Sequence, residues 1–148
     1  MTERDPWADN VARELHARRA NDLTKQKKLQ DEQDLKVLRA PEMWAELRSE
    51  LQRRVKELNV ALLVSGDLIR YEEPNGYILE VKAQNGPQSL HFRFNEPALR
   101  LHISKVSTTS DFEIGKVNGR TQWVSKEEGT MSSEQIVKLM LQDLAQSL

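Results

Sequence analysis

Two histidines and two arginines are the residues best suited to chemistry, because they alternate along neighbouring segments as His91 with Arg93 and Arg100 with His102. Two guanidinium groups and two imidazoles that converge on one oxyanion would bind a phosphate or a similar small anion. The sequence therefore predicts an anion-binding site at His91, Arg93, Arg100 and His102. The alternatives are a solvated charged surface that Glu80 partly balances, or a contact with the N-terminal helix, whose acidic residues at 31–34 would supply the missing charge.

Metal and cofactor chemistry has little support in this sequence. The chain has no cysteine, which excludes disulfides, thiolate nucleophiles and Cys-ligated zinc or iron–sulfur sites. His91 and His102 fall short of the three or four ligands that a metal site needs, and the nearby Lys82, Arg93 and Arg100 would repel a cation. We therefore expect no metal and no cofactor.

Catalytic motifs are missing as well. Serines and threonines cluster at residues 104–110 beside His102, but hydroxyl residues are common in turns for reasons of turn geometry. The chain has neither a Gly-x-Ser-x-Gly elbow nor a glycine-rich phosphate loop. The sequence favours a protein that is not an enzyme, and a hydrolase that uses His102 with a nearby hydroxyl is the weakest alternative.

Length and charge place the chain in a broad class. Its 148 residues fit one domain with an appended element, and the net charge of -1 gives no reason to expect bulk attraction to anionic lipid. The basic residues at 18–28 are followed at once by acidic residues at 31–34, which makes a nucleic-acid partner unlikely. Without an apolar leader or membrane span, we expect a soluble, cytoplasmic protein that binds no membrane.

Charge is concentrated at the N-terminus, where 25 of the first 60 residues are charged, against 20 of the remaining 88. Asp5 and Pro6 are a typical helix start, with Asp5 as the capping residue. Pro41 predicts a helix end near 39–40, because proline disfavours helical geometry in the residue before it. Residues 1–40 are therefore predicted to form a charged helical arm.

The arm carries one apolar stripe, because Trp7, Val11 and Leu15 recur every four residues. An exposed stripe with a tryptophan often marks a protein contact, so the partner would be a second copy of this chain or another protein. The alternatives are that the stripe packs on the following helix as a helical hairpin or covers an edge of the sheet.

Two amphipathic helices are predicted in the rest of the chain. Spacings of three and four residues indicate a helix at about 41–63, with its apolar face at Trp44, Leu47, Leu51, Val55, Leu58 and Leu62. A second helix at about 132–147 begins with a capping box of Ser132 and Gln135. Both should lie on the apolar face of a sheet.

The intervening residues 67–126 have a period of two and contain turn residues at regular intervals. The turn chemistry predicts a meander of about six antiparallel strands, in which Phe92 pairs with Leu101 and Ile114 with Trp123. The same registers place His91 opposite His102 and Arg93 opposite Arg100 on the polar face. In this scheme Lys105 and Lys116 are misfits, because they fall on the buried side.

These patterns predict an α+β fold of two layers, with an antiparallel meander covered on one face by the two helices. The predicted domains are the arm at 1–40 and a sheet domain at 41–148. The function predicted is a non-catalytic interaction module whose arm mediates homo-oligomerisation or recruits a partner. The alternative is a small-ligand binder, with an anion on the cationic face of the sheet or an apolar molecule in a cavity between sheet and helices.

Overall fold

The computed structural model describes residues 6–148, so the predicted capping residue Asp5 lies outside the described residues. The chain divides into two units, Met1–Leu35 and Lys36–Leu148; the second is called the sheet unit below. Two helices and seven strands are present among residues 6–148: α1 Pro6–Leu62, β1 Ile69–Asn75, β2 Ile78–Ala83, β3 Ser89–Asn95, β4 Arg100–Ser104, β5 Thr109–Val117, β6 Arg120–Ser125, β7 Gly129–Met131 and α2 Ser133–Ser147.

Helix α1 continues through Pro41, so the predicted helix end at Arg39–Ala40 is wrong. A proline inside a helix removes one backbone hydrogen bond and costs roughly 3 kcal/mol. On either side of Pro41, however, Ala40, Met43 and Trp44 are buried in the core of the sheet unit. Burying a large apolar side chain contributes roughly 1.5–3 kcal/mol, so this packing offsets the loss. The helical-hairpin alternative needs a turn near residue 40, and α1 has none there.

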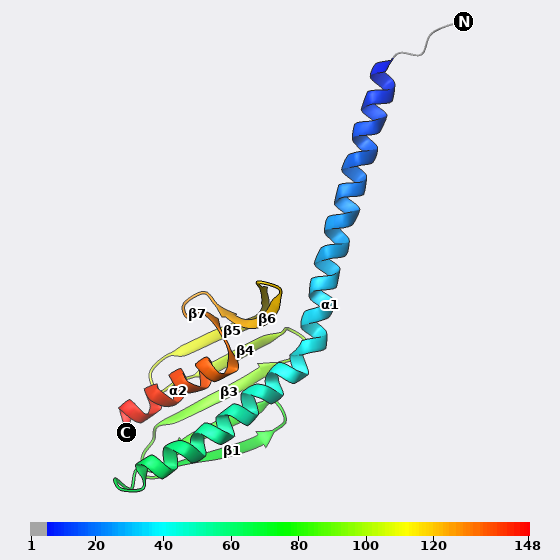
Figure 1. Cartoon of the computed structure of the whole chain (residues 1–148). Helices are drawn as coiled ribbons and strands as arrows, with labels where there is room; N and C mark the ends of the chain where they lie inside the picture. The colour runs from blue at the N-terminus through cyan, green and yellow to red at the C-terminus, as the bar shows by residue number, and fades with distance from the viewer. Residues whose placement is uncertain (1–5) are drawn as a thin grey trace, which may run out of the picture. The chain divides into compact units, whose positions relative to one another are not determined.

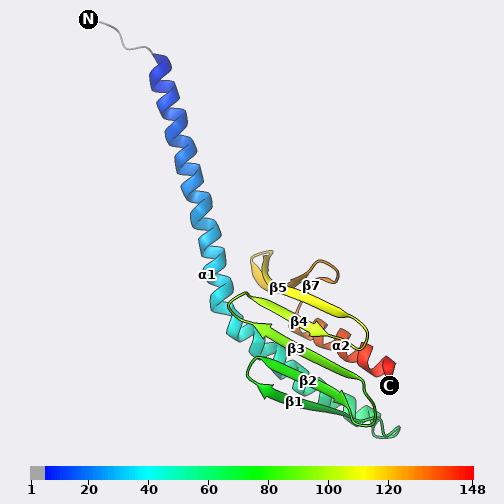
Figure 2. The same ribbon diagram turned by 180° about the vertical axis from the view of Figure 1, so that it is seen from behind.

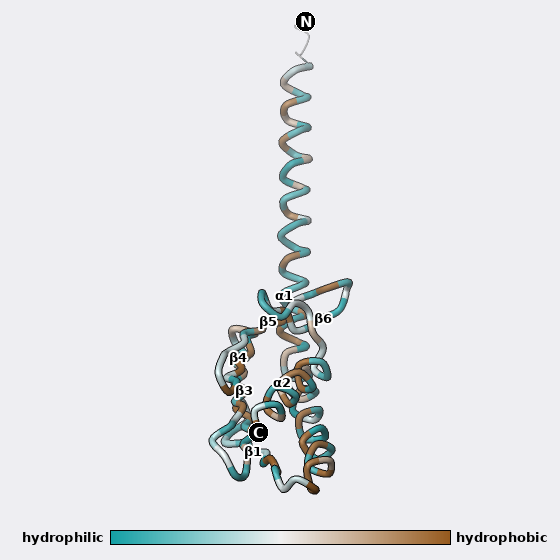
Figure 3. The backbone as a smooth tube through the Cα atoms, turned by 90° about the vertical axis from the view of Figure 1, so that its left-hand side faces the viewer, coloured by the Kyte–Doolittle hydropathy of each residue, from teal (hydrophilic) through white to brown (hydrophobic). Residues whose placement is uncertain are grey.

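The α+β fold is confirmed: the strands form one antiparallel sheet in the order β1-β2-β3-β4-β5-β6-β7. Figures 1 and 2 show α2 and the C-terminal part of α1 on one face of this sheet, with the opposite face uncovered. Figure 3 shows the same two layers edge-on. The predicted strand number is short by one, because β7 has three residues and gives no periodic signal.

The predicted faces of the sheet are confirmed. Of the residues assigned to the apolar face, Tyr71 is partly buried against the core, and the others are buried: Ile69, Leu79, Val81, Leu90, Phe92, Phe94, Leu99, Leu101, Ile103, Phe112, Ile114 and Trp123. The core also contains Leu47 and Leu51 of α1 with Ile136 and Met140 of α2. Ser132 and Gln135 form the predicted capping box at the start of α2.

Strand registers are right at one hairpin and wrong at the others. Ile114 lies opposite Trp123, as predicted, and the turn between them has φ values of 52° at Asn118 and 78° at Gly119. Phe92, in contrast, lies opposite Ile103 and not Leu101. At Asn118-Gly119 both turn residues adopt the left-handed backbone, which fixes the register of this hairpin. The Asn-Gly pairs at 75–76 and 85–86 do not adopt it, so the dipeptide alone does not fix the register of their turns.

In the other hairpins, the observed register differs from the predicted register by an even number of residues. In the first hairpin the turn chemistry predicts Tyr71 opposite Leu79, but Tyr71 lies opposite Val81, because the register shifts between Glu72 and Asn75. In the β3–β4 turn, Leu99 has a φ of 55° and belongs to the turn, not to the strand. An even displacement changes the neighbours of a residue but not its face of the sheet. The core residues of the sheet were therefore predicted correctly, although most of their cross-strand partners were not.

Candidate functional site

The uncovered face of the sheet holds the four residues of the predicted anion site. His91 and Arg93 lie on β3, and Arg100 and His102 lie on β4. Their predicted pairings are wrong, since His91 lies opposite Ser104, Arg93 opposite His102, and Arg100 opposite Asn95. The four side chains share one face but are staggered, so the two imidazoles are diagonal neighbours and the two guanidinium groups are not directly opposed.

The imidazole of His91 contacts the carboxylate of Glu80. Glu80 lies opposite His91, and its carboxylate is 3.2 Å from the imidazole Nδ1 and 3.2 Å from Lys82 Nζ. Lys82 also lies 3.3 Å from Glu72, and hydrogen bonds to Glu80 and then Glu72 raise the pKa of Lys82. This corner of the face is therefore an ion-pair network that includes two carboxylates.

The second histidine is also matched to an acid. His102 lies opposite Asp111, and their Nδ1 and Oδ1 atoms are 2.6 Å apart. Arg93, on the other side of His102, is exposed. The imidazole of His102 is therefore engaged with a carboxylate before any ligand arrives.

Arg100 borders a shallow depression of about 400 Å³. Its lining includes three acidic residues, Asp111, Glu113 and Glu127, against two basic ones, Arg100 and Lys126. An anion in this depression would approach more carboxylates than cations, which opposes binding. The geometry of the four predicted residues thus favours a balanced, solvated surface, and the anion site stays a prediction.

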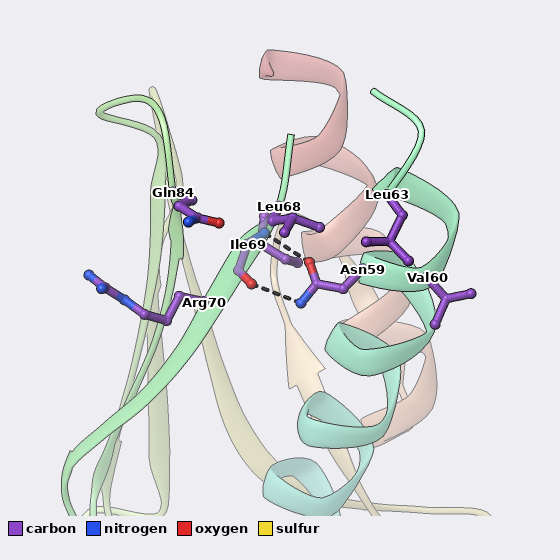
Figure 4. A pocket seen from close by; sticks show the side chains of 7 residues that line it. All are labelled: Asn59, Val60, Leu63, Leu68, Ile69, Arg70 and Gln84. Carbon is purple, nitrogen blue, oxygen red and sulfur yellow. Dashed lines mark hydrogen bonds between the residues drawn. The ribbon is translucent and has the colours of Figure 1, made fainter. Parts of the chain in front are cut away.

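An apolar groove lies at the other end of the sheet, between the last turns of α1 and strand β1. It has a volume of about 350 Å³. Figure 4 shows Val60 on α1 and Leu63 just beyond its end, across from Leu68 and Ile69, whereas the Arg70 side chain extends away from the helix. Val60 and Leu63 are more than three-fifths exposed. The size and lining suit a small apolar molecule.

Asn59 is the polar residue that organises this groove. Its side-chain Nδ2 donates to the carbonyl of Ile69 at 2.9 Å, and its Oδ1 accepts from the N–H of Ile69 at 2.9 Å (Figure 4). β1 is an edge strand, so the amide of Asn59 replaces one backbone partner that a neighbouring strand would supply. Sequence reasoning missed Asn59, because its role depends on a contact with β1.

A half-buried cluster joins α1 to the first hairpin and was also missed. Tyr71 Oη donates to a carboxylate oxygen of Glu73, and Arg48 Nε lies 3.1 Å from the same carboxylate. Trp44 Nε1 donates to the carbonyl of Gly76 at 2.6 Å. Burial and the adjacent Glu73 raise the pKa of Tyr71, so its phenol stays protonated and acts as a donor. This arrangement attaches the hairpin and supplies no nucleophile.

Lys105 and Lys116, which were both predicted on the buried side of the sheet, differ in their exposure to solvent. Lys105 is largely buried, and its Nζ lies 3.4 Å from Glu128 Oε1. Buried Ser110 donates to the same oxygen at 3.3 Å. Lys116 is exposed. The carboxylate on the β6–β7 connection therefore provides the charge that Lys105 requires beside the core.

Arm residues 6–35 present exposed side chains almost throughout, and none of these described residues is buried. In the predicted contact stripe, Trp7 is 68% exposed, Val11 45% and Leu15 42%. Leu23 and Leu29 are each 66% exposed. Figure 3 shows this stretch as mostly hydrophilic with scattered hydrophobic positions. The structure thus makes the stripe accessible to a partner.

Residues 6–148 contain neither a cluster of metal-ligating side chains nor a helix that could span a membrane. No group of three or more His, Cys, Asp or Glu side chains in residues 6–148 is arranged to hold a metal ion. None of the described helices combines the length and apolar character needed to cross a membrane. In comparisons with known proteins, no family, no curated protein and no solved structure matches this chain.

Proposed function

We propose that this protein is a non-catalytic interaction module whose helical arm binds a second copy of the chain or another protein. One observation carries the proposal: the core is made of residues from Ala40 onward, while none of residues 6–35 is buried. Residues 6–35 of the arm therefore contribute no side chain to the core. Its sequence has to be explained by something other than folding of the sheet unit.

The apolar stripe is the feature that a partner would recognise. A helix that is polar on most of its surface and buries little apolar area is only marginally stable in water. Trp7, Val11 and Leu15 would bury apolar area on a partner helix or groove, and a tryptophan at the centre of a contact often supplies much of its energy. Binding would then also stabilise the arm helix itself.

Crosslinking from within the stripe tests the proposal. A photoreactive residue at Val11 should give covalent products in cells, with a second copy or with another protein. The same residue at exposed Arg13, on the side of the helix opposite the stripe, is the matched control and should give far less. The products from Val11 should disappear when Trp7→Ser and Leu15→Ser are added. Equal labelling from both positions, or none from either, would contradict the proposal.

The small-ligand alternative is favoured by the groove beside Asn59. Its volume of about 350 Å³ is within the range of small-molecule sites. A bound apolar molecule would contact Val60, Leu63 and Leu68 and would stabilise the folded sheet unit. Addition of apolar fluorescent dyes should then raise the unfolding temperature, and Leu63→Asp should abolish that rise. An unchanged unfolding temperature with every dye would remove this alternative.

A further inference from the structure

The arm contains two blocks of opposite charge that follow each other directly. Lys25, Lys27 and Lys28 form the basic block, and Asp31, Glu32 and Asp34 form the acidic block. Glu32 is partly exposed and the other five are exposed. Because neither block is in contact with a core, their order along the helix requires a separate explanation.

The helix itself makes little use of these charges. Lys27–Asp31 and Lys28–Glu32 have the four-residue spacing of helical ion pairs, yet no ion pair joins two described residues between 10 and 35. Asp34 instead accepts from Gln30 Nε2 at 2.8 Å. A base that precedes an acid at this spacing is also the less favourable order for a single helix. Stabilisation within the arm is thus a poor explanation of the two blocks.

Resting on the proposed function, we infer that the partner is a second copy of this chain, and that the two arms pair antiparallel about a two-fold axis between residues 28 and 31. In this register Lys28 lies opposite Asp31 of the second copy. On one flank of that contact Lys27 then faces Asp34 of the second copy, and on the other flank Lys25 faces Glu32, each across the interface. The two-fold axis repeats every pair. A parallel pair in register would instead oppose each block with itself.

Side-chain size fits the same register. Thr24, Lys28, Asp31 and Leu35 follow each other at spacings of four, three and four residues, so they lie along one face of the helix. The antiparallel register places small Thr24 against large Leu35 of the second copy, on both sides of the central Lys28–Asp31 pairs. Alternating small and large residues let two helices approach closely.

The strength of the pairing follows from its chemistry. Exposed ion pairs are individually weak and are screened by salt. We therefore expect a weak dimer whose dissociation constant rises by about tenfold or more between 50 mM and 1 M salt. Sedimentation equilibrium of the full chain over a range of protein concentrations measures this.

Three variants of the full chain test the register. K25E/K27E/K28E makes both blocks acidic and should leave a monomer. Adding D31K/E32K/D34K to that variant exchanges the blocks, which restores antiparallel complementarity and should restore the dimer. K116E/R120E/K126E is the control, because it changes the net charge equally at exposed positions of the sheet unit and should leave the dimer intact. Circular dichroism checks that each variant stays helical.

Two results would overturn this inference. The first is a full chain that is monomeric at every concentration and salt, and the second is a dimer that persists in K25E/K27E/K28E. Neither by itself ends the proposed function. Crosslinks from Val11 to another protein would support it in the first case, and loss of the dimer with Trp7→Ser and Leu15→Ser would support it in the second. The inference and the proposal can therefore fail separately.

Discussion

Two stretches of the same helix have the same secondary structure for different reasons. Residues 43–55 of α1 bury Met43, Trp44, Leu47, Leu51 and Val55, whereas none of the arm residues 6–35 is buried. The first stretch is helical because its apolar face is packed under a sheet, and the second depends on its own backbone hydrogen bonds and on whatever binds it. Helical structure alone does not show which residues hold a fold together.

Matched leucine substitutions should produce the largest contrast. Leu51 is 0% exposed and Leu29 66% exposed on the same helix. Leu51→Ala removes core contacts and should lower the free energy of unfolding by about 2–5 kcal/mol. Leu29→Ala should change it by less than about 0.5 kcal/mol. Urea unfolding followed by tryptophan fluorescence gives both values, and equal losses would mean that the arm belongs to the folded core.

Pro41→Ala should give the next largest effect, with the opposite sign. Alanine restores a backbone donor in the interior of α1 and favours the helix, although the more flexible unfolded chain reduces the gain. We expect the free energy of unfolding to rise by about 2 kcal/mol. An unchanged or lower value in urea unfolding would show that packing around Met43 and Trp44 requires the proline.

Asn59→Ala tests the protected edge of the sheet. It leaves the N–H and carbonyl of Ile69 without their side-chain partners, and because the groove is open, water can replace part of the loss. We expect a cost of about 1 kcal/mol and faster hydrogen exchange at the Ile69 amide. Asn59→Asp is the control, since it keeps the acceptor for that N–H. Unchanged exchange at Ile69 in both variants would contradict this role.

The smallest effect is expected for Glu50→Gln, in the loss of folding stability as the pH falls. Hydrogen bonds from Arg53 and then Arg54 lower the pKa of Glu50 below its usual value of 4.5. The ionised form is thus favoured in the folded state, so this stabilisation is present above pH 4.5 and is lost as the pH falls through the lowered pKa. Glu50→Gln should therefore lose less stability than the parent between pH 6 and about pH 3.

The arm supplies the control for that pH profile. Glu14 takes part in no ion pair between described residues, so Glu14→Gln should follow the parent curve. Urea midpoints across the pH range measure both variants. A Glu50→Gln curve that coincides with the parent curve would show that the Glu50 network contributes nothing to acid stability.

The fold was predictable to the extent that it depends on periodicity. Phe92 and Leu101 were assigned to the correct face, because alternation along a strand needs no knowledge of its partner. Their mutual pairing was wrong, because Leu99 adopts a left-handed backbone that no glycine or asparagine announces. Pro41 was read as a helix end because the packing of its neighbours cannot be seen locally.

The candidate site was less predictable than the fold. His91 and His102 were correctly placed on the uncovered face, but their contacts depend on register, and the structure gives each of them a carboxylate, from Glu80 and Asp111. Asn59 carries no local signal at all, since an asparagine near a helix end is common and its partner, Ile69, follows a turn. Site geometry requires pairings that periodicity does not determine.

Hydrogen exchange of the full chain at increasing protein concentration tests most directly whether the arm is a binding element. The account predicts that amides of residues 6–35 exchange rapidly when dilute and become protected as the concentration rises, while amides of residues 43–55 exchange slowly throughout. Arm amides that are equally protected at every dilution would contradict it, because a single chain would then stabilise its arm without a partner.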